Sequence, residues 1–97
     1  MDKLTDEQIQ SQLANFPKWT ENGGQIVRTF QFEDFLQAIR FVNEVAKAAE
    51  AAQHHPDILI RYNKVTLTLT THDAGGITLK DFDLARKANA FAGALVA

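Results

Sequence analysis

The chain has 97 residues and a mass of 10.8 kDa, which fits a single domain spanning residues 1–97. With 45% hydrophobic residues, no cysteine and a net charge of −2, it is neither a disordered tail, a disulfide scaffold nor a cysteine-ligated metal protein. It has no basic cluster, no signal-peptide pattern and no apolar run of about 18 residues, so we expect a cytoplasmic protein that binds neither nucleic acid nor membrane.

A short helix and a hairpin are predicted first. Thr5 and Gln8 have the spacing of a capping box, in which each side chain accepts a bond from the other residue's backbone N–H, and the helix should run to about Ala14. Trp19 then opens a short strand, and residues 25–30 form a second one. Asn-Gly between the two extended segments is a strong signal for a tight turn.

A long helix should follow, ending at about Gln53 before Pro56. Glu33 and Asp34 suit its first turn, where the helix dipole favours anions. The residues expected to face the core are Phe35, Ile39, Val42, Ala46 and Ala49, and a second apolar stripe consists of Phe41, Val45 and Ala48. Two apolar stripes indicate a helix that also contacts another subunit.

Two alternating segments and a last helix complete the pattern. Apolar residues at 58, 60 and 62 and at 65, 67 and 69 alternate with polar ones, and only Asn63-Lys64 separates them, so they predict a hairpin. Thr78 and Asp81 form a second capping box before the last helix. The order α-β-β-α-β-β-α predicts an α+β fold: a single four-stranded antiparallel sheet with three helices packed on one face.

All three histidines lie within residues 54–72. His54 and His55 end the long helix and His72 follows the last strand, so all three should lie at one rim of the sheet. The negative end of the helix dipole favours an imidazolium at His54. Glu50, one turn earlier, is placed to orient that ring or to stabilise its charge. Imidazoles titrate near neutrality and can both donate and accept protons.

Other interpretations of the same residues stay open on spacing alone. Histidine is common at helix C-termini, where it can simply cap the last carbonyls. Three histidines and Glu50 could bind zinc, although no His-x-His or His-x-x-x-His pair occurs. Capping is enough to explain Asp81, and Trp19 and Tyr62 fit a core or a hairpin better than a ligand platform.

The chain resembles the pterin-4a-carbinolamine dehydratase family over nearly its whole length. The residues that carry the resemblance are 50–57 (EAAQHHPD), 62–65 (YNKV), 71–78 (THDAGGIT) and Asp81, with Trp19 and 30–32 (FQF) upstream. Several fixed spacings within 32 residues make the match specific, and the family's fold has the element order predicted above. The chain departs from animal members in having Ile58 and Ala74, where they usually have tryptophan and cysteine.

The resemblance implies dehydration of 4a-hydroxytetrahydropterin to quinonoid dihydropterin, which recycles the pterin cofactor of aromatic amino acid hydroxylases. It implies no metal and no organic cofactor, and a homodimer joined through the sheet or a homotetramer joined through helices. The family's active-site histidines match His54, His55 and His72. The positions expected to bind substrate are Glu50, Gln53, Thr70, Thr71, Asp73 and Asp81.

Elimination of water across C4a and N5 needs an acid for the leaving hydroxyl and a base for the N5 proton. We expect His54 and His72 to transfer these protons and His55 to position the pterin. Two other functions fit the resemblance. One is a protein-binding module of the dimerisation-cofactor or transcriptional-coactivator type, because animal relatives bind a homeodomain transcription factor. The other is a dehydratase-like chaperone for a different pterin, such as a molybdopterin precursor. The three histidines favour the enzyme, because scaffolding needs no imidazole at these points.

Overall fold

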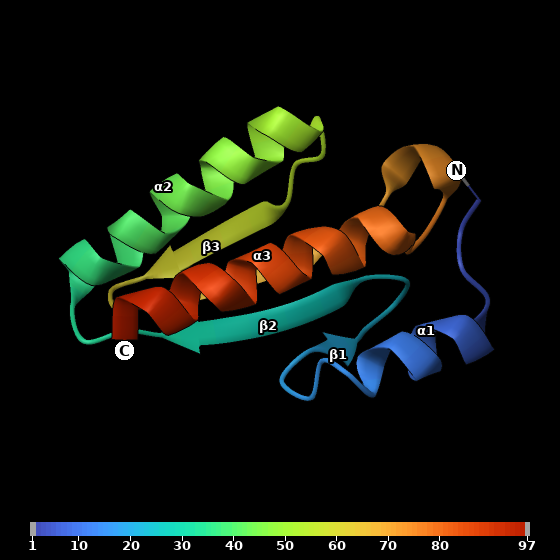
Figure 1. Ribbon diagram of the computed structural model, residues 1–97, viewed down its shortest axis with the longest axis horizontal. Helices are drawn as coiled ribbons and strands as arrows, with labels where there is room; N and C mark the ends of the chain where they lie inside the picture. Colours follow the sequence, from blue (N-terminus) through green and yellow to red (C-terminus); the bar gives the residue numbers. More distant parts are fainter. Residues whose placement is uncertain (1, 97) are drawn as a thin grey trace.

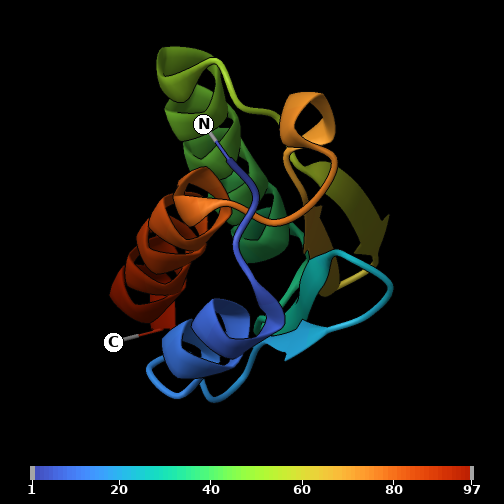
Figure 2. The same ribbon diagram turned by 90° about the vertical axis from the view of Figure 1, so that its right-hand side faces the viewer.

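The computed structural model describes residues 2–96 and confirms the predicted order of elements (Figure 1). The elements are α1 (Asp6–Leu13), β1 (Thr20–Glu21), β2 (Ile26–Gln31), α2 (Phe35–Ala52), β3 (Asp57–Arg61), β4 (Lys64–Leu69), the 3-10 turn η1 (His72–Ala74) and α3 (Leu79–Val96). The strands form one antiparallel sheet in the order β1-β2-β4-β3, and the helices lie on one side of it (Figure 2). The predicted α+β class is therefore correct. Within residues 2–96, no helix is long and apolar enough to span a bilayer.

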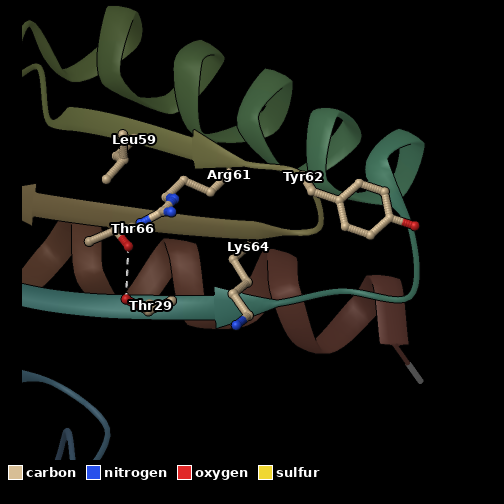
Figure 3. A pocket seen from close by; sticks show the side chains of 6 residues that line it. All are labelled: Thr29, Leu59, Arg61, Tyr62, Lys64 and Thr66. Carbon is tan, nitrogen blue, oxygen red and sulfur yellow. Dashed lines mark hydrogen bonds between the residues drawn. The ribbon is translucent and has the colours of Figure 1, made fainter.

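The two faces of the sheet differ in chemistry because successive side chains of a strand point to opposite sides. Val65, Leu67 and Leu69 of β4 are buried beneath the helices. Thr66 lies on the other face, where its hydroxyl is 2.8 Å from that of Thr29 on β2 (Figure 3). This second face carries no helix (Figure 2). Its side chains line a shallow depression of about 700 Å³ (Figure 3).

Aromatic rings hold α2 against the sheet. The ring centroid of Phe41 on α2 lies 4.6 Å from that of Phe30 and 4.9 Å from that of Phe32. Trp19 packs edge-on against Phe30 at 5.9 Å and is buried, which confirms it as a core residue. Rings at these separations contribute attraction beyond the area they bury.

The core-facing side of α2 is only partly the one predicted. The buried residues of this helix are Ala38, Phe41, Val45 and Ala49, while Phe35 remains 46% exposed. Ala49 is buried as predicted and Val42 packs against the core, but the completely buried residues Phe41 and Val45 belong to the stripe expected to contact another subunit. Both stripes are apolar and adjacent on the helix, so periodicity alone could not choose between them. Contact with Phe30 and Phe32 decides the orientation.

The turn between β3 and β4 begins one residue earlier than predicted. Tyr62 and Asn63 form it, and Arg61 and Lys64 are paired across the strands. Tyr62 takes a left-handed φ of 55°, and the side-chain amide of Asn63 donates to the carbonyl of Phe32 at 2.8 Å. The alternation of apolar and polar residues continues through Tyr62, so this pattern does not show where the turn begins.

The interior of α3 contains a glycine that could be replaced with a gain in stability. Gly93 has no left-handed φ, and a Cβ added there would meet no atom within 4 Å. Glycine inside a helix costs about 0.5–1 kcal/mol relative to alanine. Gly93→Ala should therefore raise the free energy of unfolding by about that amount in a urea titration. Gly75→Ala is the control and should lower it, because Gly75 has a φ of 76°. Stabilisation by both substitutions would contradict this account.

Candidate active site

The histidines come from segments that meet at one end of the molecule. His54 and His55 follow the last turn of α2, and His72 begins η1. The carboxyl end of α2, the η1 turn and the first turn of α3 all lie at the end that faces the viewer in Figure 2. The predicted common rim is therefore present, and it includes the start of α3.

A buried histidine–aspartate pair lies at the centre of this rim. His54 Nε2 is 2.5 Å from Asp81 Oδ1, across 27 residues of sequence, and His54 is 8% exposed while Asp81 is completely buried. A carboxylate only accepts hydrogen bonds, so Nε2 carries the proton and donates it. Nδ1 is then the ring nitrogen left for another partner.

Asp81 also joins two threonines to this pair. Its Oδ2 accepts bonds of 2.9 Å from the hydroxyl of Thr71 and from the backbone N–H of Thr78. The two threonine hydroxyls are 2.7 Å apart. Because the Thr71 proton is committed to Asp81, the Thr78 hydroxyl must donate to Thr71, and it accepts in turn from the N–H of Lys80 at 3.2 Å. Such aligned hydrogen bonds strengthen one another.

The local sequence explains how His54 reaches α3. Gln53 ends α2 in the left-handed region, at a φ of 53°, and the N–H of His54 closes the helix on the carbonyl of Ala49 at 3.0 Å. This turn and Pro56 redirect the chain toward β3. Asp81 lies in the first turn of α3, and its carboxylate accepts from the N–H of Thr78, which is one of the two bonds of the predicted capping box. The second bond differs, because the Thr78 hydroxyl accepts from the N–H of Lys80 and not from that of Asp81. Capping is only part of its role, because the same carboxylate binds His54.

Glu50 pairs with His55, and the predicted contact with His54 is wrong. Glu50 Oε1 lies 2.7 Å from His55 Nε2, and both side chains are mostly exposed. The left-handed residue Gln53 breaks the helical spacing on which the prediction relied. It turns the ring of His54 toward Asp81 and leaves His55 within reach of Glu50. An exposed pair of this kind contributes little to stability.

The remaining predicted residues lie around the hydrogen-bonded network of His54 and Asp81, and not all of them bond to it. Gln53 is exposed and its side-chain amide donates to the carbonyl of Glu50 at 3.1 Å. Thr70 donates to the carbonyl of Gly24 at 3.0 Å, on the β1–β2 turn. His72 and Asp73 are exposed on η1, directly after Thr71. Thr78, which the sequence places in a cap and in the family motif but not among the expected site residues, belongs to the hydrogen-bonded network.

A small cavity adjoins His54. Its volume is about 90 Å³, and it is lined by Ala52, His54, Lys80, Asp83, Leu84 and Lys87. The buried histidine therefore forms one wall of a small cavity whose other lining residues come from α2 and α3. Within residues 2–96, no group of three or more His, Cys, Asp and Glu side chains is close enough together to hold a metal ion.

The sequence is similar to a known protein family along most of its length. The family model described as pterin 4 alpha carbinolamine dehydratase matches residues 2–91. A protein from Picosynechococcus sp. is 60% identical over 83 residues, which is 86% of this chain and 90% of the relative. One from Thermomicrobium roseum is 55% identical over 87 residues, or 90% of this chain and 94% of the relative. Both carry a provisional designation as pterin-4-alpha-carbinolamine dehydratases.

Two solved structures share the fold. One, described as a transcriptional coactivator/pterin dehydratase from Brucella melitensis, has a TM-score of 0.92, 37% identity, and coverage of 95% of this chain and 100% of its own. The other is a pterin dehydratase-like protein identified as a RuBisCO assembly factor in the alpha-carboxysome. It has a TM-score of 0.68, 25% identity, and coverage of 78% of this chain and 90% of its own.

The buried carboxylate should contribute strongly to stability. Asp81→Ala leaves the donors of His54, Thr71 and Thr78 without their acceptor in the protein interior, so we expect a loss of about 2–4 kcal/mol in the free energy of unfolding. Asp83→Ala is the matched control on the same helix, because Asp83 is exposed and its ion pair within residues 2–96 is with exposed Arg86. It should cost less than about 1 kcal/mol. Equal losses in urea denaturation would contradict the central role of Asp81.

Proposed function

Since the chain belongs to the pterin-4a-carbinolamine dehydratase family, we propose that it removes water from 4a-hydroxytetrahydropterin to give quinonoid dihydropterin. The observation that carries this proposal is the buried His54–Asp81 pair at the rim. Burying two ionisable groups is costly, and groups held in this way concentrate at functional sites. The product would re-enter the cofactor cycle of an aromatic amino acid hydroxylase in the cytoplasm.

The proposed reaction needs only proton transfers. The C4a–O bond breaks as an acid protonates the leaving hydroxyl, and the N5 lone pair forms the C4a=N5 double bond. A base then removes the N5 proton, so that one water leaves and the total number of protons on the two groups is unchanged. Proton exchange with the solvent then restores the acid and the base to their starting forms. We assign the two transfers to His54 and His72, with no metal or organic cofactor. Asp81 holds His54 in the tautomer that presents Nδ1 to the substrate, as second groups commonly do for catalytic imidazoles.

The other residues are assigned according to their exposure. His55, paired with Glu50, positions the pterin, and Gln53, Thr70 and Asp73 contribute polar contacts around it. Thr71 was also expected to bind the substrate, but it is buried and bonded to Asp81, so we assign it to the support of that carboxylate. Asp81 was expected to bind the substrate directly. Because it is completely buried, we assign it as a positioning residue that acts through His54.

A second function is favoured by the comparisons. One structural neighbour is described as a transcriptional coactivator and another as a RuBisCO assembly factor, so members of this fold also act on proteins. A binding module would need the surface of the fold but no proton transfer at its rim. A measurement of catalytic turnover therefore distinguishes the proposed enzyme from the protein-binding module.

The activity can be measured as quinonoid dihydropterin formed from chemically generated 4a-hydroxytetrahydropterin. His54→Ala and His72→Ala should each lower kcat by about 10²–10⁴, the range of general acid–base catalysis. His55→Ala should instead raise KM more than it lowers kcat, because it removes binding shared by the ground and transition states. No acceleration by the unsubstituted protein would exclude the dehydratase, and a folded His54→Ala protein with unchanged kinetics would exclude the assigned role.

We also propose that the chain forms a homodimer by pairing β3 with β3 of a second copy. β3 is an edge strand, and Leu59 on it is 56% exposed (Figure 3). Unpaired strand edges are normally covered. In an antiparallel pair centred on Leu59, Asp57 of each copy lies opposite Arg61 of the other, which is a favourable cross-strand pair. Exposed Phe35 and Leu36 on α2 offer a further contact for a tetramer.

The register can be tested with single charges. Leu59→Lys places two ammonium groups opposite each other at the centre of the pair and should produce a 10.8 kDa species in sedimentation equilibrium. Leu36→Lys is the control, since it changes an equally apolar side chain on α2 and should leave the dimer intact. A monomeric unsubstituted protein at micromolar concentration would rule out the dimer.

A further inference from the structure

A half-open groove of about 440 Å³ separates β2 from the second half of α3, away from the histidines. Its walls include Lys18, Arg28, Phe32, Asn89, Gly93 and Val96. Asn89 lies eight residues after Asp81 on the same helix, about 12 Å along its axis. The groove is therefore separate from the candidate active site.

Arg28 is an unusual residue for this position. It lies on β2 opposite Leu67, in the row of side chains that faces the helices, and its guanidinium carbon is 4.0 Å from the ring centre of Phe30. Burial lowers the pKa of Arg28 from its ordinary value. Within residues 2–96, no carboxylate forms an ion pair with it. A charge withdrawn from water without a counter-ion is costly.

The hydrogen bonds of Arg28 are also incomplete. Its Nη1 donates to Asn89 Oδ1 at 2.6 Å, and Trp19 Nε1 donates to the same oxygen at 2.9 Å. Arg28 Nε is buried and has no partner among the described residues. A guanidinium has five N–H donors in a planar fork. Asn89 uses one donor of Nη1 and the Nε donor is buried, so the remaining donors on Nη1 and Nη2 are available to a planar or tetrahedral anion.

We propose that this groove binds a small molecule through a carboxylate or phosphate group held between Arg28 and Lys18. Arginine binds both kinds of oxyanion through paired N–H donors, and the lysine ammonium adds a second positive charge. The ligand's apolar body would lie along α3 at Gly93, where a Cβ would meet no protein atom within 4 Å. The site does not depend on the proposed dehydratase activity.

Trp19 provides a direct test because it is the chain's single tryptophan and shares its acceptor with Arg28. Its indole N–H resonance is followed in a proton–nitrogen correlation spectrum during titration with inorganic phosphate or with benzoate, at an ionic strength held constant with sodium chloride. A saturable shift with either probe is expected, and the effective probe identifies the oxyanion. Shifts that do not saturate with either would overturn the proposal.

Variants separate the site from general charge effects. Arg28→Gln should weaken the binding of the effective probe by about tenfold or more, whereas Arg40→Gln, which removes an exposed arginine on α2, should not. Gly93→Leu fills the groove while keeping both cations and replaces glycine by a better helix former, so it should block binding even if Arg28→Gln does not fold. Unchanged affinity in the folded variants would overturn the proposal.

Discussion

A carboxylate withdrawn from water needs donors for both of its oxygens, and Asp81 finds them in three separate parts of the chain. Its partners are the ring of His54 after α2, the hydroxyl of Thr71 after β4 and the N–H of Thr78 at the start of α3. These bonds tie together the segments that form the rim. The geometry of the candidate site therefore depends on one buried charge, which is satisfied only when all three segments are in place.

The same helix carries a contrasting environment further along. At its first turn the negative charge of Asp81 is fully bonded, whereas about 12 Å further on Asn89 supplies a single oxygen to the partly buried cation Arg28. The first arrangement stabilises a fixed imidazole, and the second leaves donors available to an external anion. The two sites therefore differ in how far the protein itself bonds the charged group. It supplies donors to both oxygens of Asp81, whereas it leaves donors of Arg28 for the proposed ligand.

The sequence predicted those features that depend on local spacing. The Thr5 capping box is present with both of its bonds, and the element order is correct, because capping and period-two alternation act over a few residues. Its errors involve tertiary contacts or irregular backbone. The inner face of α2 is chosen by Phe30 and Phe32, and the partner of Glu50 is set by the left-handed conformation of Gln53. Neither the ring contacts of α2 nor the backbone conformation of Gln53 produces a recognisable pattern of apolar residues in the sequence.

Asp81 shows why a sufficient local explanation can hide a second role. Its spacing from Thr78 predicted a cap, and the cap is present. A cap by itself needs no imidazole, however, and a fold that served only as a binding surface could end α2 with an apolar residue against α3. Such a replacement would avoid the cost of burying a histidine and an aspartate together. The cost of burying this pair supports the proposed catalytic role, in which Asp81 fixes the imidazole of His54 and leaves Nδ1 for the proposed pterin substrate.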